Sequence, residues 1–414
     1  MQRLISYMIL KKEGGNQMKY LVIGVGAIGT VIAKDLAQAK NTTEVGLADI
    51  NLEFAQELAD EIGGNTKAIH VDIYDEHLLR KVIKDYDVVV NATGPFYKTV
   101  RYVVEACINE KIDYVDVADD SAAVEVLFEY DQRCKEAGIT ALICQGASPG
   151  TTNILALLGS KQLDKTHEIH TNWIVSMLSE SNNVRNLGAT YYHALEMSTG
   201  TNPQFLNGEI TGVPSASGTK EIQFIAPKDK YPVHYVGHGE PLTLSMHIPN
   251  VKTVTNRGNI WPGAMDISNL KVFEAIGLAD DTTIDINGTE LNRRDIAFAL
   301  ISEQFAVDPK EFKDAEKVEF QIHVEVNGEK EGKAVMYEYT CATEMNPATG
   351  LSASYAAQVV AHANKKMTGI VAPEQYLEVK PYLQYLESKG FEFYVSITKD
   401  GKTSKPALLN TEEI

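Results

Sequence analysis

The chain has 414 residues, of which 44% are hydrophobic and 23% charged, which is enough for two or three ordinary globular domains. These proportions exclude a disordered chain, a collagen-like repeat and a small disulfide-stabilised protein. The 56 acidic residues outnumber the 38 basic ones, for a formal net charge of -18, and the densest basic clusters are pairs. We therefore expect no nucleic-acid partner and no membrane partner.

Cysteine usage and hydropathy indicate a cytoplasmic protein. No C-x-x-C pair occurs, which argues against a disulfide framework and a zinc site, so we expect no metal. The cysteines are Cys107, Cys134, Cys144 and Cys341. No apolar run approaches the roughly 18 residues of a membrane span. Residues 1–17 lack a small-residue cleavage site and are predicted to be a frayed leader, not a signal peptide.

Short apolar runs alternate with helical patterns through the first third of the chain. Strands are predicted at 20–25, 44–48, 68–71, 87–90, 114–117 and 140–144. Helices are predicted between them at 28–36, 51–62, 78–83, 102–108 and 124–137. Such alternation predicts an α/β fold with a doubly wound parallel sheet and right-handed crossovers.

The pattern changes after residue 144. A glycine-proline junction at 146–151 leads into a predicted helix at 154–163. Period-2 runs, which favour an antiparallel sheet, follow at 170–177, 221–225, 241–248, 317–326 and 335–340. The polar connections expected to bear substrate loops are 179–188, 198–218 and 255–263. A last long helix is predicted at 351–366, so the middle of the chain is interpreted as an α+β domain.

Three glycines mark the turn after the first predicted strand. Gly24, Gly26 and Gly29 have G-x-G-x-x-G spacing and open a helix, which is the context of a dinucleotide-binding turn. Gly24 permits the tight turn, Gly26 the approach of a pyrophosphate, and Gly29 close packing of helix on strand. The helix start, with Ala27 and Ile28, offers N–H groups to the phosphates. A glycine turn without a ligand is the alternative.

Asp49 ends the second predicted strand, twenty positions after Gly29. A carboxylate there accepts hydrogen bonds from a ribose 2′-hydroxyl and repels a 2′-phosphate. No arginine follows, because the next residues are Ile50, Asn51 and Leu52. The sequence therefore predicts NAD as cofactor in preference to NADP.

Two further strand ends are candidates for contact with the cofactor. Asp72 follows the third strand and either contacts the adenosine half or caps the next helix. The fourth strand ends beside the switch point of the sheet, where backbone would lie near a nicotinamide ribose. The residues predicted to do so are Asn91, Ala92, Gly94 and Pro95.

Taken together, the motifs resemble the saccharopine dehydrogenase family, most closely its lysine 6-dehydrogenase-like branch. The resemblance runs from about residue 18 to the mid-380s. The glycine motif is shared by many dehydrogenases, whereas the ordered GPF, YVDVAD and SPGTTN combination is more specific. The matching segments are VIGVGAIG (22–29), LAD (47–49), VVVNATGPF (88–96), YVDVAD (114–119), GASPGTTN (146–153), GHGEPLTL (237–244) and GIVAPE (369–374).

The resemblance implies a Rossmann-type dinucleotide domain at 18–148 with 349–385, and an inserted substrate-binding and dimerisation domain at 149–348. It implies a homodimer that transfers hydride between NAD(P) and a C–N bond of a lysine-type amino acid. The reaction would be an oxidative deamination or an imine reduction of the lysine 6-dehydrogenase or saccharopine dehydrogenase type. Two alternatives remain: a non-catalytic dinucleotide-binding sensor or interaction subunit, and a polyamine-pathway reductase of the carboxynorspermidine dehydrogenase type.

The chemistry requires a base and a hydroxyl near the reacting carbon. Asp119 matches a family position that faces the substrate, and it either handles the ammonium proton or caps the next helix. Tyr97 either donates its hydroxyl near the nicotinamide or packs against that ring. His193, in a helical run, is a further candidate base because imidazole titrates near neutrality.

Three residues of the second domain are predicted to bind the substrate. Arg185 and Arg257 lie in polar loops, and a guanidinium binds a carboxylate in a bidentate manner. Surface solvation is the alternative for either arginine. His238 lies in a Gly-His-Gly turn, which has either a binding or a purely structural reason.

Overall fold

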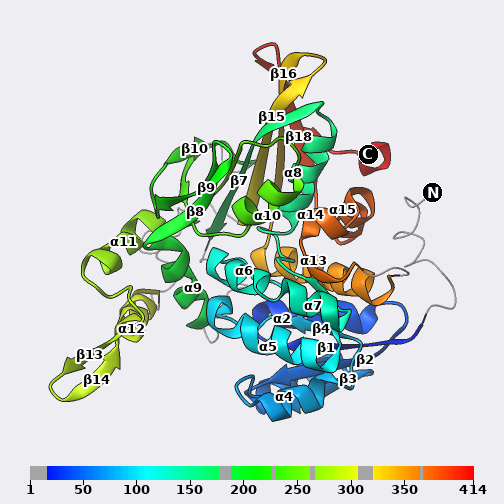
Figure 1. Cartoon of the computed structure of the whole chain (residues 1–414), viewed down its shortest axis with the longest axis vertical. Helices are drawn as coiled ribbons and strands as arrows, with labels where there is room; N and C mark the ends of the chain where they lie inside the picture. Colours follow the sequence, from blue (N-terminus) through cyan, green and yellow to red (C-terminus); the bar gives the residue numbers. More distant parts are fainter. Residues whose placement is uncertain (1–15, 177–187, 226–229, 262–265, 306–319, 364–366) are drawn as a thin grey trace. The chain divides into compact units, whose positions relative to one another are not determined.

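The computed structural model describes residues 16–176, 188–225, 230–261, 266–305, 320–363 and 367–414 (Figure 1). Two compact units are present. Unit 1 runs to Lys161 and includes Asn346–Glu392 and Leu408–Ile414, and unit 2 comprises Gln162–Met345 and Phe393–Ala407. Residues 1–15 of the predicted leader lie outside the described residues.

Unit 1 contains the predicted parallel sheet. The strand order is β17-β6-β5-β4-β1-β2-β3, and every neighbouring pair is parallel. The α/β prediction is confirmed, and β17 adds an edge strand that was not predicted. The strands are β1 (Met18–Ile23), β2 (Thr42–Asp49), β3 (Thr66–His70), β4 (Val88–Asn91), β5 (Asp113–Asp116), β6 (Thr140–Leu142) and β17 (Gly369–Val371).

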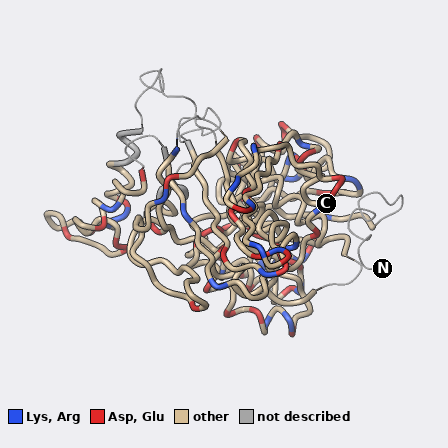
Figure 2. Tube along the Cα trace, turned by 90° about the horizontal axis from the view of Figure 1, so that it is seen from above, with Lys and Arg blue, Asp and Glu red and all other residues tan. Residues whose placement is uncertain are grey.

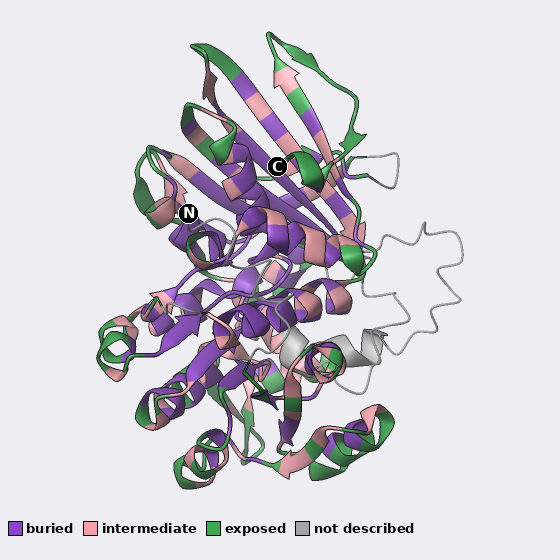
Figure 3. Ribbon diagram, turned by 90° about the vertical axis from the view of Figure 1, so that its right-hand side faces the viewer, coloured by how far each residue is buried: buried purple, intermediate pink, exposed green. Residues whose placement is uncertain are grey.

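The central strands form the core of unit 1. Tyr20 to Ile23 and Val88 to Val90 are buried, as expected for strands covered on both faces (Figure 3). The helices are α2 (Ala27–Gln38), α3 (Leu52–Ile62), α4 (Glu76–Ile83), α5 (Phe96–Glu110), α6 (Ser121–Phe128), α7 (Asp131–Ala137), α8 (Thr151–Lys161), α13 (Met345–Ala361), α14 (Pro373–Tyr376), α15 (Val379–Ser388) and the 3₁₀ turn η4 (Thr411–Glu413).

Local signals explain where several helices begin and end. Asn51 caps α3 by accepting from the N–H groups of Glu53 and Phe54, and Asp75 caps α4. The single helix predicted at 124–137 is wrong. Two consecutive i→i−3 bonds, from the Glu129 and Tyr130 N–H groups, tighten the backbone and separate α6 from α7.

Helix α13, far along the chain, packs on α2. A Cβ on Gly350 would lie 2.6 Å from the Val31 Cβ, so only glycine permits this approach. One turn further along α13, the hydroxyl of Ser354 donates to the buried carboxylate of Asp35 on α2. Lys389, the residue directly after α15, forms an ion pair with the same carboxylate. Small residues on the last long helix therefore serve close helix packing in unit 1.

Unit 2 contains a mixed sheet with main order β10-β11-β12-β7-β15-β16-β18-β19. β12 runs parallel to β7, and the other pairs are antiparallel. The strands are β7 (Lys165–Ser176), β8 (Thr201–Leu206), β9 (Glu209–Pro214), β10 (Lys220–Ile222), β11 (Tyr231–Tyr235), β12 (Thr253–Trp261), β13 (Thr283–Ile286), β14 (Thr289–Asn292), β15 (Phe320–Lys330), β16 (Lys333–Thr343), β18 (Phe393–Lys399), β19 (Lys402–Thr403) and β20 (Ala407–Leu408). The helices are α9 (Gly188–Ser198), α10 (Glu240–His247), α11 (Ile267–Ala275) and α12 (Arg293–Phe305).

Several predictions for unit 2 are wrong. The run 241–248 is helix α10, because Gly239 caps it and Pro241 suits its first turn. The polar stretches 198–218 and 255–263 contain β8, β9 and most of β12 instead of being only loops. Strand β12 carries polar residues on both faces, so it shows no apolar alternation that would have predicted a strand.

The register gives the unit 2 sheet two distinct faces. Asn172 on β7 pairs with Arg257 on β12 and with His323 on β15, whereas Trp173 pairs with Gly258. Because side chains alternate along a strand, these two rows point to opposite sides. We call them the Arg257 face and the Trp173 face.

Charged side chains of both signs are interspersed along the described chain (Figure 2). Exposed ion pairs link some of them, such as Lys34 with Glu61 and Arg133 with Glu105. Within the part of the chain that the structure describes, no helix combines the length and apolar character needed to cross a membrane.

Candidate active site

The glycine turn between β1 and α2 has the shape of a phosphate cradle. Gly24 has φ +86°, and a Cβ there would lie 2.8 Å from the Ala92 carbonyl oxygen. A Cβ on Gly29 would lie 1.9 Å from the Gly24 oxygen, whereas one on Gly26 would meet nothing within 4 Å. Helix α2 starts without a side-chain cap. The turn thus leaves open space beside uncapped N–H groups, which fits a pyrophosphate.

Asp49 lies at the end of β2, next to the glycine turn. Its two carboxylate oxygens accept from the N–H groups of Val25 and Asn51, each at 2.9 Å. These bonds fix the carboxylate while leaving lone pairs on both oxygens. Its position fits a group that accepts hydrogen bonds from a ribose diol.

The ends of β3 and β4 complete the candidate cofactor edge. Asp72 accepts from the Tyr74 N–H at 2.9 Å, and Asp75 takes the capping role that was the alternative for Asp72. The Asn91 side chain accepts from the Thr93 N–H at 3.1 Å, and the Ala92 N–H donates to the Ile23 carbonyl. A cis peptide joins Gly94 to Pro95. Contact of these residues with a nucleotide stays a prediction.

Asp116, which was not predicted as a site residue, joins two loops at the same edge of the sheet. One oxygen accepts from the N–H groups of Ala118, after β5, and Cys144, after β6, at 3.1 and 2.8 Å. The carboxyl group is fully buried, and burial raises its pKa to about 6. Asp116 therefore positions the loop that carries Asp119.

This buried carboxyl group makes stability depend on pH. Because the folded-state pKa is raised, the folded chain binds the proton more tightly, and stability increases as the pH falls through about 6. We expect the free energy of unfolding of unit 1 to increase by about 1 kcal/mol when the pH is lowered from 7 to 5. The Asp116→Asn variant, whose side chain has nearly the same shape but does not titrate, should not show this increase. Urea unfolding of both proteins measures this, and identical pH profiles would contradict it.

Asp119 and Tyr97 both follow strands at the carboxyl-terminal edge of the sheet. Asp119 is partly exposed, and the neighbouring Asp120 caps α6 by accepting from the Ala123 N–H at 2.7 Å. The capping alternative for Asp119 is therefore wrong. Tyr97, near the start of α5, is also partly exposed, with its ring 5.5 Å from the Lys98 Nζ.

On the Trp173 face of unit 2, a buried histidine has unusual surroundings. His238 is 3% exposed and stacks on Trp173 with ring centroids 5.2 Å apart. The His193 ring lies 5.9 Å away, and a Glu240 oxygen lies 3.7 Å from the His238 Nδ1. Among the described residues, neither ring nitrogen of His238 has a hydrogen-bond partner. A buried imidazole whose two nitrogens make no hydrogen bond indicates a ligand-binding position.

Trp173 is itself held in place. Its indole N–H donates to the side-chain oxygen of Asn256 at 3.2 Å. The Asn256 side chain in turn donates to the Thr171 hydroxyl at 2.8 Å, and its backbone N–H donates to the Gln204 side chain at 2.8 Å. Sequence reasoning missed Trp173, Asn256 and Glu240. A usable signal existed, because Trp173 is one of two tryptophans and Glu240 directly follows the Gly-His-Gly turn.

The predicted substrate residues do not gather in one place. Arg257 lies on the Arg257 face, whereas His238 contacts Trp173 on the other side of the sheet. The sheet therefore separates these two side chains. The prediction that Arg257 lies in a loop is wrong, because Arg257 belongs to strand β12. Arg185 lies outside the described residues.

Comparisons with known proteins agree with this architecture. Residues 20–142 match the saccharopine dehydrogenase NADP binding domain, and residues 146–391 match the saccharopine dehydrogenase C-terminal domain. The chain is 23% identical over 411 residues to carboxyaminopropylagmatine dehydrogenase of Synechocystis, covering 91% of this chain and 97% of the relative. It is 25% identical over 355 residues to carboxynorspermidine synthase of Vibrio cholerae, covering 77% and 79%.

A solved structure shares the fold. Saccharopine dehydrogenase (L-Glu forming) from Saccharomyces cerevisiae superposes with a TM-score of 0.65 at 18% identity, covering 94% of this chain and all of that one. The resemblance in the motifs, the parallel sheet with its glycine turn, and the two matching domain models lead to one assignment. The chain belongs to the saccharopine dehydrogenase family and is an oxidoreductase of that family.

Proposed function

We propose that this oxidoreductase acts on the C–N bond of a carboxylated polyamine-type amine. The observation that carries the substrate class is the similarity, over most of both chains, to two enzymes named for carboxylated amines. This favours the polyamine alternative over a lysine-type substrate. No basic residue directly follows Asp49 at the end of β2, and this bears on the choice of cofactor and not on the amine.

The proposed reaction interconverts a secondary amine with an imine, which water hydrolyses to an amine and a carbonyl compound. In the oxidative direction the carbon beside nitrogen loses a hydride and the nitrogen loses a proton. A bound nicotinamide supplies the hydride acceptor or donor. The residues of this chain bind the two halves of the substrate and move the proton at its nitrogen.

We assign the proton-handling roles to His238 and Asp119. His238 is buried against Trp173 and neither of its ring nitrogens makes a hydrogen bond, which supports its hydrogen bonding to a substrate nitrogen. The partly exposed Asp119, in the loop that follows β5, suits the binding of an ammonium group. The ring of His193 lies beside that of His238, and we propose that it helps to position His238. A His193 variant would measure its effect on kcat separately.

For the cofactor we propose NAD in preference to NADP. The carboxylate of Asp49 at the end of β2 supports this choice, because it favours a ribose diol over a 2′-phosphate. The matching family model is described as an NADP binding domain, so the preference is specific to this chain's residues. A homodimer likewise stays a prediction.

The function is tested by following oxidation of NADH or NADPH with purified protein. The substrates are diamines and agmatine, each combined with an aldehyde that carries an amino-acid group, and lysine and saccharopine are assayed in the oxidative direction. We expect turnover with a diamine or agmatine and much less with lysine. Nucleotide binding without turnover of any amine would instead support a sensor.

Replacing His238 by glutamine should lower kcat by about 100-fold or more, because proton transfer by a positioned side chain contributes about 10²–10⁴-fold. The matched control is His77→Gln on the exposed surface of α4, which should leave kcat unchanged. Steady-state kinetics with the best amine make the comparison. A normal kcat for His238→Gln would remove His238 from the mechanism.

A further inference from the structure

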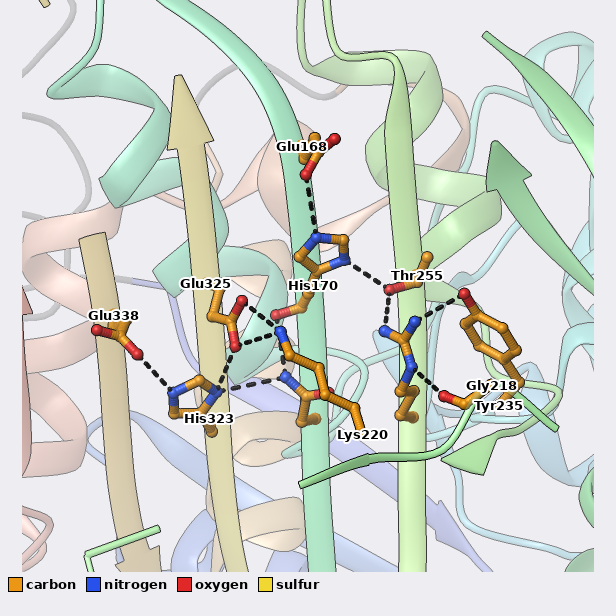
Figure 4. A network of polar contacts seen from close by, with 11 residues as sticks. Glu168, His170, Gly218, Lys220, Tyr235, Thr255, His323, Glu325 and Glu338 are labelled. Carbon is orange, nitrogen blue, oxygen red and sulfur yellow. Dashed lines mark hydrogen bonds and ion pairs between the residues drawn. The ribbon is translucent and has the colours of Figure 1, made fainter. Parts of the chain in front are cut away.

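Arg257 is a buried cation held by neutral groups. It is 8% exposed, and its guanidinium donates to the Gly218 carbonyl at 2.9 Å, the Thr255 hydroxyl at 2.7 Å and the Tyr235 hydroxyl at 2.7 Å (Figure 4). The guanidinium carbon lies 4.1 Å from the centre of the Tyr235 ring. A buried charge is costly unless an opposite charge compensates it, and none of these three partners supplies one.

The carboxylates around it are already used. Both oxygens of Glu325 accept hydrogen bonds from the Lys220 ammonium group, at 2.8 and 2.7 Å. Glu338 faces the His323 Nε2 at 3.5 Å. Within the described residues, Arg257 forms no ion pair with any carboxylate, so its charge is not locally neutralised by contact.

His170 contacts the same Thr255 hydroxyl as the Arg257 guanidinium, and the ring supplies no negative charge. Because Arg257 only donates, the Thr255 oxygen accepts from it and turns its own proton to the His170 Nδ1, 2.8 Å away. His170 then carries its proton on Nε2, which faces Glu168 at 3.4 Å. Burial lowers the pKa of His170, in agreement with a neutral ring that accepts at Nδ1.

A metal ion does not explain this cluster. His323, Glu325 and Glu338 are metal-ligating types that lie close together. However, the imidazole meets the two carboxylates through different nitrogens, Nδ1 with Glu325 at 3.9 Å and Nε2 with Glu338 at 3.5 Å. Lys220 also occupies both oxygens of Glu325. On this face the nearby Glu325 acts on Arg257 only from beyond contact distance, so within the described residues no carboxylate touches the guanidinium.

We propose that Arg257 anchors a binding site for a small oxyanion, a carboxylate or a phosphate group, on the Arg257 face. Three of the five guanidinium N–H groups are used by Gly218, Thr255 and Tyr235, so two remain for a bidentate contact. The site is distinct from the Trp173 face, on which the proposed substrate residue His238 lies. It does not rest on the proposed function.

Titration calorimetry of the full chain with malonate and with inorganic phosphate, at constant ionic strength, tests the site. We expect saturable binding by the unmodified protein and at least tenfold weaker binding by Arg257→Gln. Arg133→Gln is the matched control, because Arg133 is an exposed arginine paired with Glu105. His238→Gln should also bind normally. The tighter of the two probes identifies a carboxylate or a phosphate ligand.

Three results would overturn the proposal: no saturable binding of either anion, unchanged affinity of Arg257→Gln, or equal loss in His238→Gln. Circular dichroism checks that the variants fold. If Arg257→Gln does not fold, crystals of the unmodified protein soaked in selenate replace it. An anomalous peak at the Arg257 guanidinium supports the site, and its absence there rejects the proposal.

Discussion

Substituting arginine for Asp49 should change the ratio of kcat/KM for NAD to that for NADP by about 100-fold or more in favour of NADP. The carboxylate accepts from a ribose diol, and its loss removes both this contact and the repulsion of a 2′-phosphate. A guanidinium in its place pairs with the phosphate in a charge-assisted contact. Steady-state kinetics with both nucleotides, at fixed amine concentration, measure the ratio.

Asp49 also accepts from the backbone of Val25 and Asn51, so the variant needs a control for folding. Asp49→Asn keeps an acceptor oxygen for one of these N–H groups and removes the charge. It should lose part of the preference for NAD and retain a melting temperature near that of the unmodified protein. An unchanged nucleotide ratio in both variants would show that Asp49 does not select the cofactor.

Two alanine substitutions in the same turn should affect different properties, one the stability of the fold and the other the binding of the nucleotide. Gly29→Ala places a Cβ 1.9 Å from the Gly24 oxygen, a backbone clash that should destabilise unit 1 by about 3 kcal/mol or more. Gly26→Ala meets no atom within 4 Å, so it should fold normally. Its methyl group would fill the space proposed for the pyrophosphate and should weaken nucleotide binding by at least about tenfold.

Thermal unfolding and fluorescence titration with NADH separate these two effects. Gly29→Ala should melt at a lower temperature, whereas Gly26→Ala should melt normally and bind poorly. If Gly26→Ala binds NADH like the unmodified protein, the glycine turn is only a turn, and the assignment of the cradle is wrong.

The fold of unit 1 was predictable because its signals are local and agree with one another. Buried parallel strands are short apolar runs, as in Tyr20 to Ile23, and the glycine motif stands between such a run and a helix. Asp49 was found for the same reason, since the end of a strand places it. Asp116 was missed, because its role depends on bonds to Cys144 and Ala118 that no spacing reveals.

Unit 2 was predicted less well because its sheet has polar residues on both faces. Strand β12 carries Asn256 toward Trp173 and Arg257 toward the opposite side, so neither face shows an apolar alternation. Without knowing that 253–261 is a strand, the sequence cannot place Arg257 and His238 on different faces. Likewise, alternating apolar residues at 241–248 favoured a strand, whereas the capping and proline signals at Gly239 and Pro241 produce a helix.

The proposed reaction transfers a hydride between the nicotinamide and a carbon bonded to nitrogen. The most direct test uses NADH deuterated at the transferred position of nicotinamide C4, together with the best diamine and aldehyde pair. Mass spectrometry of the product should find one deuterium per molecule, on the carbon that joins the amine to the former aldehyde. Product without deuterium at that carbon, or no product while NADH binds, would contradict the claim.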